Sequence, residues 1–301
     1  MATALIAIDW GTSSARAWWL DGRGAILAER AAPLGVQKVA QGRFHDALKS
    51  LLGGDAPAGV PLLACGMIGS RQGWLEAPYV DCPAGFASVA EGLVRVTDAP
   101  LAIVPGMTCR DAQGVPDVMR GEETQIFGAL DDLGAQQLVA LPGTHSKWAL
   151  VGGGAIERFA TFMTGELYAV LREHSILGRL AAPGSDAAAF ERGVSTSLRP
   201  AAALSHDLFS ARTLTLAGEL APEGVADYLS GLLLGAEVAA AQSWIAHSGA
   251  RGLGVTLIGE PALCGRYDRA LSIAGLAARS GPSDAAARGL WRIALQAGLV
   301  R

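Results

Sequence analysis

The sequence predicts an α/β fold with two domains, each built on a mixed sheet with flanking helices. Three observations favour this fold class. The chain has 301 residues, which is more than one compact domain usually needs. Apolar runs of strand length alternate along it with longer amphipathic segments. A strand, a small polar turn and another strand occur at the N-terminus and again at 138–156, which indicates a duplicated unit.

The amino-acid composition and the net charge limit the kinds of molecule that the protein is expected to bind. Half of the residues are hydrophobic and only 17% are charged, which argues against disorder. The formal net charge of −4 leaves no basic footprint, so we expect no nucleic-acid partner. The four cysteines form no Cys-x-x-Cys pair, which is typical of reduced thiols in a cytoplasmic protein. No stretch approaches the roughly 20 apolar residues of a membrane helix, so we expect no membrane partner and a cytoplasmic location.

The first candidate site is the turn at residues 9–14, which lies between two predicted strands. Gly11 allows the backbone to approach a ligand closely, and the hydroxyls of Thr12 and Ser13 add donors that can surround an anion. Asp9, at the strand end, can hold Mg²⁺ beside a bound phosphate. The turn is therefore either a phosphate and magnesium cradle or an ordinary hairpin turn.

Two segments further along the first half carry candidate ligand groups. The sequence GMIGSRQGW, residues 66–74, directly follows a buried strand, where open α/β sheets place ligand sites. It carries Arg71 and Trp74. A later helix is predicted to begin with Glu122 and Glu123 in its first turn. These acidic residues either complement the helix dipole or provide a general base.

The polar segment 131–137 is the predicted crossing between the domains, because a second strand-turn-strand pattern follows it at once. The first domain then covers residues 1–133 and the second covers residues 134–301. The second hairpin echoes the first, with a glycine, hydroxyl groups and a lysine between its strands. These residues are Gly143, Thr144, Ser146 and Lys147.

A third element lies late in the chain, where a strand at 254–258 runs into Gly259 and Pro261 and then into a helix. Strand, glycine and helix are generic on their own, but their order after two hairpins is informative. Residues 225–247 have the longest helical pattern, which we interpret as a core helix of the second domain.

The order of these elements resembles a known superfamily. The chain has no Gly-x-x-x-x-Gly-Lys-Ser/Thr loop, Gly-x-Gly-x-x-Gly turn, Gly-x-Ser-x-Gly elbow or His-Glu-x-x-His pair. Its Asp-x-Gly-Thr-Ser turn instead resembles the first phosphate motif of the actin and sugar-kinase superfamily, and the strand before Gly259 resembles the adenosine motif. The resemblance implies a two-domain actin-like ATPase (ribonuclease H-like) fold, with a nucleotide cleft between the domains.

A narrower resemblance covers nearly the whole chain. The blocks IDWGTSSARAW, GMIGSRQGW, VMRGEETQIFGAL, LPGTHSKW, TFMTGELYAVLREHSILG and DYLSGLLLGAE are similar to the 2-keto-3-deoxygalactonate kinase family. LPGTHSKW and RGEETQ are the most specific of them. The chain departs from the broader superfamily because the second hairpin lacks an Asp before Gly143 and the adenosine motif has one glycine instead of two. The narrower family shares both departures.

This resemblance implies an enzyme that uses ATP and Mg²⁺. The reaction would phosphorylate the terminal C6 hydroxyl of 2-dehydro-3-deoxy-D-galactonate to give 2-dehydro-3-deoxy-6-phosphogalactonate, in galactonate catabolism. The expected partners are therefore ATP and a small sugar acid, and the sequence leaves open whether the chain forms a homo-oligomer. The first domain would hold the first phosphate hairpin and the sugar-acid site, and the second would hold the second hairpin and the adenosine motif.

The resemblance also suggests a role for each candidate residue. Asp9 would hold the metal, and either Glu122 or Glu123 would orient or deprotonate the acceptor hydroxyl. The substrate carboxylate would bind a guanidinium, and the candidates are Arg71, with Trp74 on the same loop, and Arg120. The phosphate ligands would be Gly11, Thr12, Ser13, Gly143, Thr144, Ser146 and Lys147. The adenosine ligands would be Gly259 and Pro261.

Purely structural roles for some of these residues, and two other functions for the protein, stay open on sequence alone. Arg71 and Arg120 suit structural salt bridges equally well, and Lys147 suits a solvated turn. The segment RGEETQ also resembles the Glu-Glu helix of exopolyphosphatases on the same fold, so a phosphohydrolase of that type is the alternative. A nucleotide-dependent binding protein is the third hypothesis, although little chain remains for a partner-binding domain.

Overall fold

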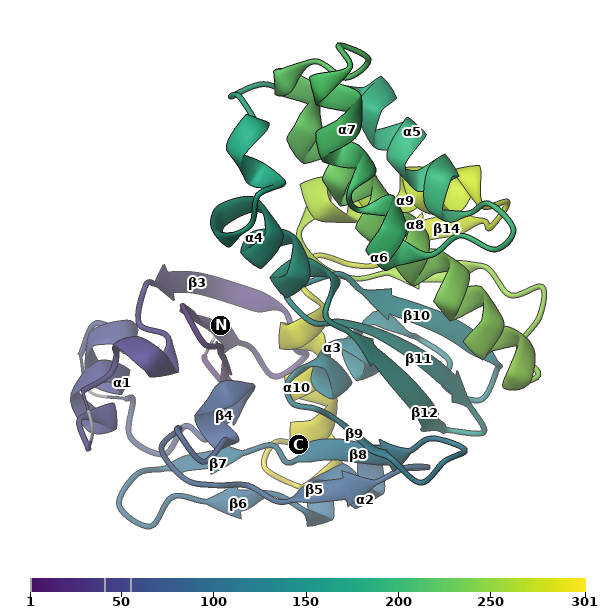
Figure 1. Ribbon diagram of the computed structural model, residues 1–301. Coiled ribbons are helices and arrows are strands. Elements are labelled where there is room, and N and C mark those ends of the chain that lie inside the picture. Colours follow the sequence, from purple (N-terminus) through teal and green to yellow (C-terminus); the bar gives the residue numbers. More distant parts are fainter. Residues whose placement is uncertain (1, 41, 55) are drawn as a thin grey trace. The chain divides into compact units, whose positions relative to one another are not determined.

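The computed structural model describes residues 2–40, 42–54 and 56–301, which fold into two compact units (Figure 1). Unit 1 consists of Met1–Gln136, Leu150–Phe159 and Gly281–Arg301. Unit 2 consists of Gln137–Ala149 and Ala160–Ser280. The C-terminal segment thus belongs to unit 1, whereas the sequence predicts a second domain over 134–301 that would include it.

Unit 1 is built on a six-stranded sheet in the order β3-β2-β1-β4-β7-β6. β1 pairs antiparallel with β2 and parallel with β4, and β4 pairs parallel with β7. Asp9 therefore lies opposite Arg16 on one neighbouring strand and opposite Cys65 on the other, at the end of a buried core strand. The strands are β1 (Leu5–Trp10), β2 (Ala15–Leu20), β3 (Ile26–Ala32), β4 (Leu62–Cys65), β6 (Val94–Arg95) and β7 (Leu101–Ile103).

A second, three-stranded sheet and four α-helices complete the described part of unit 1. The sheet has the order β5-β8-β9, with β5 (Tyr79–Asp81), β8 (Gly106–Arg110) and β9 (Pro116–Met119). The α-helices are α1 (Phe44–Leu52), α2 (Phe86–Glu91), α3 (Glu122–Ala129) and α10 (Ala285–Gln296). Short 3-10 turns occur at η1 (Val36–Lys38) and η2 (Met67–Gly69).

Helices α3 and α10 cross at very close range, which explains why the C-terminal segment is part of unit 1. A Cβ atom on Gly128 would lie 1.8 Å from the carbonyl oxygen of Ala285. One on Gly289 would lie 1.9 Å from the carbonyl oxygen of Thr124. Only glycine fits at these two positions, so the crossing depends on residues about 160 positions apart in the chain.

Unit 2 repeats the strand order of unit 1. Its five-stranded sheet has the order β12-β11-β10-β13-β14, and β10, β13 and β14 are parallel. This matches the β3-β2-β1-β4-β7 part of the first sheet, so the predicted duplication of mixed sheets on a ribonuclease H-like plan is confirmed. The strands are β10 (Gln137–Leu141), β11 (Ser146–Gly152), β12 (Ala155–Phe162), β13 (Val255–Leu257) and β14 (Ala278–Ser280). The ends of β11 and β12, Leu150–Phe159, are grouped with unit 1.

Six α-helices accompany the sheet of unit 2 (Figure 1). They are α4 (Thr164–His174), α5 (Ala187–Ser197), α6 (Leu204–Asp207), α7 (Ser210–Leu216), α8 (Val225–His247) and α9 (Pro261–Ile273). Two 3-10 turns, η3 (Gly178–Leu180) and η4 (Pro222–Gly224), connect them. Helix α8 packs against α4, α5 and α9 and has apolar side chains on every face.

One expectation about α8 was wrong. The helical segment Pro222–His247 is long and apolar enough to pass for a membrane span, whereas no such stretch is expected from the sequence. Most of it is buried against the other helices of unit 2, which accounts for its composition. It also carries two buried carboxylates, Asp227 and Glu237.

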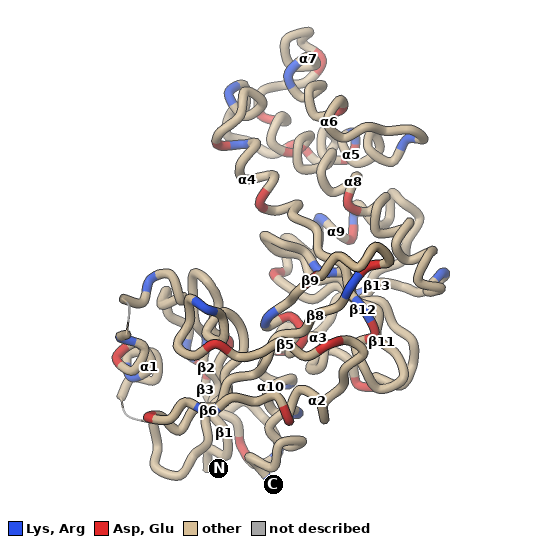
Figure 2. Tube along the Cα trace, turned by 60° about the horizontal axis from the view of Figure 1, so that its bottom comes forward, with Lys and Arg blue, Asp and Glu red and all other residues tan. Residues whose placement is uncertain are grey.

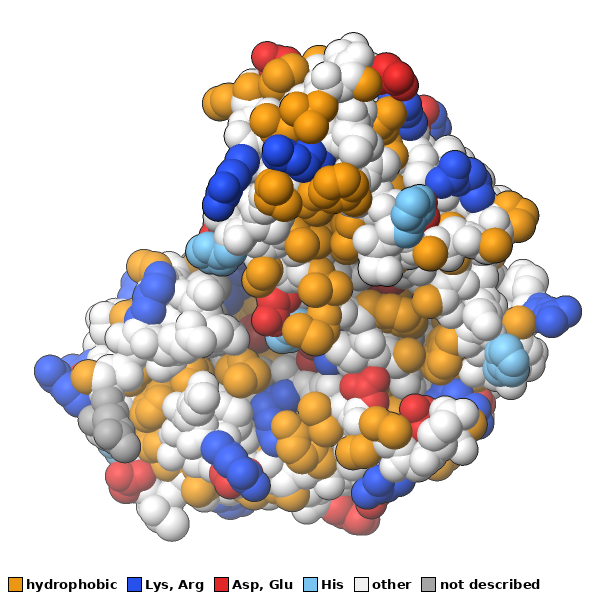
Figure 3. All heavy atoms as spheres, viewed as in Figure 1, with side chains coloured by type: hydrophobic (Ala, Val, Ile, Leu, Met, Phe, Trp, Pro, Cys, Tyr) orange, Lys and Arg blue, Asp and Glu red, His pale blue; other side chains and the backbone are white. Residues whose placement is uncertain are grey.

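The surface shows both charge signs and some apolar side chains. Acidic and basic residues are interspersed along the chain rather than separated by sign (Figure 2). Hydrophobic side chains are visible over the helices of unit 2 on the face drawn in Figure 3. Helix α4 contributes to the exposed apolar surface through Leu167 and Val170. All four cysteines are free thiols.

Candidate active site

The first turn of unit 1 is held from behind by the segment that follows β3. The amide of Gly11 donates to the carbonyl of Ser14 at 2.9 Å, which closes the turn. The carbonyls of Gly11 and Thr12 accept from the amides of Val36 and Gln37 at 3.0 and 3.2 Å. The side chains of Thr12 and Ser13 are exposed. The turn is therefore fixed in shape while its hydroxyls face solvent, as an anion cradle requires.

Three segments of unit 1 meet at Asp9. Gly66, at the end of β4, has a φ of 89°, and a Cβ atom there would lie 3.2 Å from Oδ1 of Asp9. Gly121, with a φ of 107°, starts α3, and a Cβ atom on it would lie 3.1 Å from the Cα of Gly66. The two glycines thus let β1, β4 and the N-terminus of α3 converge. Cys65 adds a side-chain hydrogen bond to Asp9.

These close surroundings change the pKa of the Asp9 carboxyl group. Burial, and then the negative charge of Glu122, raises the pKa of Asp9 to about 6. Arg16 and the Cys65 hydrogen bond act in the opposite direction. The carboxylate is therefore ionised at neutral pH but close to a second acidic group, which is the environment of a cation ligand.

Glu122 and Glu123 have different surroundings. Glu123 is fully buried, and its oxygens accept from the Gly121 amide at 2.7 Å and the Thr124 hydroxyl at 2.8 Å. Burial, and then the charge of Glu122, raises the pKa of Glu123 to about 7. Glu122 is partly exposed, and its Oε2 accepts from the Arg120 amide at 2.9 Å. Glu123 thus stabilises the start of α3 from inside, whereas Glu122 reaches solvent and acts electrostatically on Asp9.

Arg71 and Trp74 line a cavity of about 410 Å³ in unit 1, together with Gln72, Gly73 and Phe44. The Trp74 ring stacks on that of Phe44 with centroids 5.9 Å apart, so it packs and lines the cavity at once. The Arg71 side chain is 87% exposed and its Nε lies 3.0 Å from Oε1 of Glu76. A surface pair of this kind contributes little to stability, so the guanidinium can exchange partners at low cost.

Arg120 does not line that cavity, but its Nη1 lies 3.0 Å from the position that a Cβ atom on Gly69 would take, within the 66–74 segment. Its Nη2 donates to the carbonyl of Ala77 at 2.8 Å, and its guanidinium lies 4.3 Å from the ring centroid of Tyr79. No described residue provides a hydrogen-bond partner for its buried Nε and Nη1. Buried donors without a partner are costly and are typical of a site that takes a ligand.

In unit 2, the turn of the second hairpin packs against the first turn of α4. The Glu166 amide donates to the carbonyl of Thr144 at 3.0 Å. A Cβ atom on Gly165 would lie 2.4 Å from the carbonyl oxygen of Gly143, so this approach requires glycine. The carboxylate of Glu166 also pairs with the ring of His145. Gly143 is partly exposed and Thr144 is exposed, which leaves the turn accessible to an anion.

Ser146 and Lys147 of the same hairpin are buried. Oγ of Ser146 lies 3.3 Å from the carbonyl of Phe162 and is directed into the interior of unit 2. Nζ of Lys147 donates to the Thr161 hydroxyl at 2.7 Å, and only 6% of the residue is exposed. Lys147 is therefore not the solvated turn lysine that the sequence left open, because β11 is buried on both faces.

The candidate adenosine motif lies next to the second hairpin within unit 2. Gly259 has a φ of 153°, and a Cβ atom on it would lie 3.3 Å from the carbonyl oxygen of Pro142. Helix α9 begins at Pro261 and is capped by Glu260, whose carboxylate accepts from the amides of Ala262 and Leu263 at 3.0 and 2.8 Å. The structure thus brings the candidate phosphate turn and the candidate adenosine motif together.

Sequence reasoning missed several residues that build these sites. Gly66 and Gly121 shape the Asp9 site, and their signal was a glycine directly after a buried strand and directly before a helix. Glu237 of α8 hydrogen-bonds to Trp148 and Tyr267 beneath the second hairpin. Its signal was a single acidic residue on an otherwise apolar helix face.

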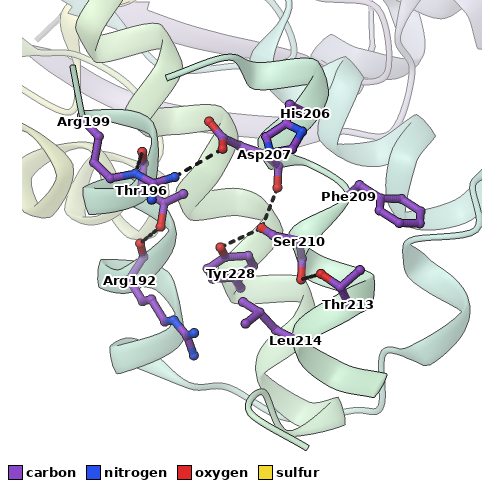
Figure 4. Close-up of a pocket in the computed structure, with 10 residues that line it drawn as sticks. All are labelled: Arg192, Thr196, Arg199, His206, Asp207, Phe209, Ser210, Thr213, Leu214 and Tyr228. Atoms are coloured by element: carbon purple, nitrogen blue, oxygen red, sulfur yellow. Dashed lines mark hydrogen bonds and ion pairs between the residues drawn. The ribbon is translucent and has the colours of Figure 1, made fainter. Parts of the chain in front are cut away.

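Another cavity lies in unit 2, and none of the candidate site residues from the sequence lines it. It has a volume of about 440 Å³ and lies among α5, α6, α7 and the start of α8 (Figure 4). Its arginines are already engaged, because Arg199 lies 3.2 Å from Asp207 and Arg192 lies 3.7 Å from the carboxylate of Glu219. The hydroxyls of Ser210 and Tyr228 bond to each other at 2.8 Å.

The donor set of unit 1 fits a Mg²⁺ ion that arrives with phosphate. Among the described residues, no group of three or more His, Cys, Asp or Glu side chains is placed to hold a metal. Mg²⁺ sites of nucleotide enzymes use one or two carboxylates, with water and phosphate oxygens as the other ligands. Asp9, with Glu122 acting on it, provides such a partial set beside the hydroxyl-lined turn.

Comparisons with known proteins agree over almost the full length of the chain. The family model described as 2-keto-3-deoxy-galactonokinase matches residues 9–293. A probable 2-dehydro-3-deoxygalactonokinase of Rhizobium meliloti (strain 1021) is 41% identical, covering 95% of this chain and 97% of that protein. The 2-dehydro-3-deoxygalactonokinase of Escherichia coli (strain K12) is 38% identical, covering 91% of each. A crystal structure of a protein assigned this activity in Sinorhizobium meliloti has a TM-score of 0.86 at 38% identity, covering 96% of this chain and 98% of that one.

Proposed function

The chain belongs to the 2-keto-3-deoxy-galactonokinase family, and on that premise we propose how its residues transfer phosphate from ATP to the C6 hydroxyl of 2-dehydro-3-deoxy-D-galactonate. The product is 2-dehydro-3-deoxy-6-phosphogalactonate, in galactonate catabolism. The relatives compared above are all named or assigned as kinases, and they give no support to the phosphohydrolase alternative.

The observation that carries the proposal is the convergence of β1, β4 and the start of α3 at Asp9, beside the hydroxyl-bearing turn. Asp9 would hold Mg²⁺, which when bound neutralises charge on the transferring phosphate. The backbone of Gly11 and the hydroxyls of Thr12 and Ser13 bind phosphate oxygens on the same side. Phosphoryl transfer needs mainly positioning and charge stabilisation, and a fixed turn beside a carboxylate supplies both.

Glu122 is the proposed base. The C6 oxygen forms a bond to the γ-phosphorus, while the bond from that phosphorus to the bridging oxygen of ADP breaks. Glu122 accepts the proton that the C6 hydroxyl releases. Glu123 is less suitable because it is fully buried and both of its oxygens accept hydrogen bonds within α3. It is the residue that holds the start of α3 in place for Glu122.

The acceptor site is proposed at the cavity beside α1. Arg71 lines it and is engaged only in an exposed pair with Glu76, so the substrate carboxylate can replace that partner. Trp74 supplies an apolar wall for the carbon chain of the sugar acid. Arg120 is the second candidate, because its Nε and Nη1 have no described partner.

The nucleotide ligands of unit 2 are proposed at the second hairpin and at the start of α9. Gly143 and Thr144 contribute backbone amides and a hydroxyl to the phosphates. Lys147 supplies positive charge from the buried strand behind them, and Ser146 supports the turn from inside. Gly259 and Pro261 form the surface for adenosine, next to Pro142 of the hairpin. We place the reaction in the cytoplasm, where ATP is available.

The proposal is tested by incubating the purified protein with ATP, Mg²⁺ and the sugar acid while ADP and inorganic phosphate are measured separately. The expected result is ADP formed only with the sugar acid, without matching phosphate. Release of phosphate at the same rate with and without the acid would contradict it and favour a hydrolase. Omission of Mg²⁺ should abolish ADP formation, and the gluco epimer measured in parallel reports the selectivity.

A further inference from the structure

Glu237 lies in the middle of α8 with only 3% of its surface exposed. Its Oε1 accepts from Nε1 of Trp148 at 2.8 Å, and its Oε2 accepts from the hydroxyl of Tyr267 at 2.9 Å. Ser146 and Thr164 are further side-chain hydrogen-bond partners of this carboxyl group. Burial raises the pKa of Glu237, and these four partners act against that rise. A buried carboxyl group with this many hydrogen-bond partners fixes the side chains around it.

The four partners come from three different segments of unit 2. Ser146 and Trp148 belong to β11 of the second hairpin, where alternate residues point to the same face. Thr164 is the first residue of α4. Tyr267 belongs to α9 and is almost completely buried. One side chain of α8 therefore bonds to the hairpin strand and to two other helices.

Two of these segments lead directly to the proposed nucleotide ligands. The first turn of α4 binds the tip of the hairpin, through the Glu166 amide and the carbonyl of Thr144 at 3.0 Å. Helix α9 begins at Pro261, two residues after Gly259, which packs against Pro142 of the hairpin. A change in the position of Glu237 would therefore move the phosphate turn and the adenosine motif relative to each other.

We propose that Glu237 is a positioning residue for ATP, which holds the phosphate turn at 142–146 and the start of α9 at the separation that one nucleotide requires. The inference rests on the nucleotide roles proposed above for these two segments. Glu237 contacts no reacting atom in this account and acts only through its four partners. Its contribution should therefore appear in the affinity for ATP and not in the affinity for the sugar acid.

Asp227 provides a matched control on the same helix. It is also a buried carboxylate, with 8% of its surface exposed. It accepts from Nη1 of Arg266 on α9 at 2.6 Å and from the Asp186 amide at 2.6 Å. It makes no described contact with the second hairpin. Loss of Asp227 therefore weakens one contact between α8 and α9 but leaves the bonds from Glu237 to the hairpin and to Tyr267 of α9 in place.

The test compares Glu237→Gln with Asp227→Asn. The glutamine keeps the size of the side chain but replaces one acceptor oxygen with an amide donor, so either Trp148 or Tyr267 loses its acceptor. We expect Glu237→Gln to raise the Kd for ATP, measured by titration calorimetry, at least tenfold. The KM for the sugar acid should change less than twofold. Asp227→Asn should lower the Tm while leaving the Kd for ATP within twofold of the wild-type value.

A second variant keeps the inference testable if Glu237→Gln does not fold. Tyr267→Phe removes one donor and leaves the carboxylate in place, and we expect it to raise the Kd for ATP several-fold. In the double variant with Glu237→Gln, the effect of Tyr267→Phe should largely disappear, because both changes break the same interaction. Fully additive effects, or an unchanged Kd for ATP in Tyr267→Phe and Glu237→Gln, would overturn the inference.

The measurements also separate this inference from the proposed function. ATP binding is measured without the sugar acid, so it does not depend on the acceptor. A wild-type protein that binds ATP but does not phosphorylate the acid would contradict the function and leave the Glu237 comparison valid. A wild-type protein that phosphorylates the acid, with an unchanged Kd in Glu237→Gln, would contradict the inference alone. Absence of ATP binding by the wild-type protein would contradict both.

Discussion

Gly66 packs so closely on Asp9 that a Cβ atom at this position would lie 3.2 Å from Oδ1 of the carboxylate. The same atom would lie 2.9 Å from the carbonyl oxygen of Trp10, and the φ of 89° is itself unfavourable for other residues. Gly66→Ala should therefore displace Asp9, lower kcat more than tenfold and destabilise the protein by about 2 kcal/mol. Steady-state kinetics and chemical denaturation measure the two effects.

Gly114→Ala is the matched control for this prediction. Gly114 has a φ of 81°, close to that of Gly66, but no atom lies within 4 Å of the position its Cβ would take. Backbone strain should lower the free energy of unfolding of the Gly114→Ala variant by about 1 kcal/mol, and its kcat should stay unchanged. Equal kcat values for the two alanine variants would show that Gly66 does not position Asp9.

The two glutamates of α3 should differ in their effect on turnover. Glu122→Gln removes the proposed base, and we expect kcat to fall by a factor of about 100 to 10,000. Glu123→Gln should lower kcat less than tenfold, because its side chain faces the interior and supports α3. Both rates are measured at saturating ATP and sugar acid. The reverse order, or full turnover in both variants, would remove Glu122 from the proposed role.

The pH dependence of stability should reveal the buried carboxyl of Glu123. Its pKa is raised from 4.5 in the unfolded chain to about 7, so the folded state binds the proton more tightly. Stability from this group is fully present below pH 4.5 and is lost as the pH rises through 7. Glu123→Gln removes this dependence. As the pH rises from 5 to 8, the free energy of unfolding of the variant should therefore increase by about 2 kcal/mol relative to that of the wild type.

Urea denaturation of both proteins at these two pH values provides the measurement. Wild-type Glu123 is protonated at pH 5 and mostly ionised at pH 8, whereas the glutamine is neutral at both, so the change in the stability difference between the two proteins reports the titration of Glu123. A stability difference between variant and wild type that does not change with pH would mean that Glu123 titrates normally.

The sugar-acid site should respond to Arg71. Arg71→Ala removes the proposed carboxylate ligand, so the KM for the sugar acid should rise at least tenfold while the KM for ATP stays unchanged. Stability should not change, since the side chain is 87% exposed. Arg110→Ala, which removes another exposed guanidinium of unit 1, is the control and should have no effect on either KM. A larger effect from Arg120→Ala than from Arg71→Ala would move the carboxylate site to Arg120.

The hairpins and their turns could be predicted from sequence because their signals are local. A buried strand, a polar turn with glycine and a second strand occupy a short stretch, and the two copies order the rest of the chain. The position of α10 could not be predicted in this way. It depends on Gly128 and Gly289, which let two helices far apart in sequence approach closely, and nothing near 281–301 in the chain indicates that partner.

The sequence around the second hairpin also could not show which of its side chains are buried. A strand with one solvated face would leave Lys147 exposed, but β11 is buried on both faces, so both Ser146 and Lys147 are enclosed. The choice between Glu122 and Glu123 could not be made from the sequence for the same reason. Both residues suit the first turn of a helix, and their different burial becomes visible only once α3 is packed against the rest of unit 1.

The position of the phosphate on the product tests the central claim most directly. Phosphorus NMR of a completed reaction with ATP, Mg²⁺ and 2-dehydro-3-deoxy-D-galactonate reports this position through coupling to neighbouring protons. The account predicts one new phosphate ester, split by the two protons of the C6 methylene group and equal in amount to the ADP formed. An ester coupled to a single proton would place the phosphate on another hydroxyl. Inorganic phosphate as the only new signal besides those of ADP would contradict the assignment of a kinase.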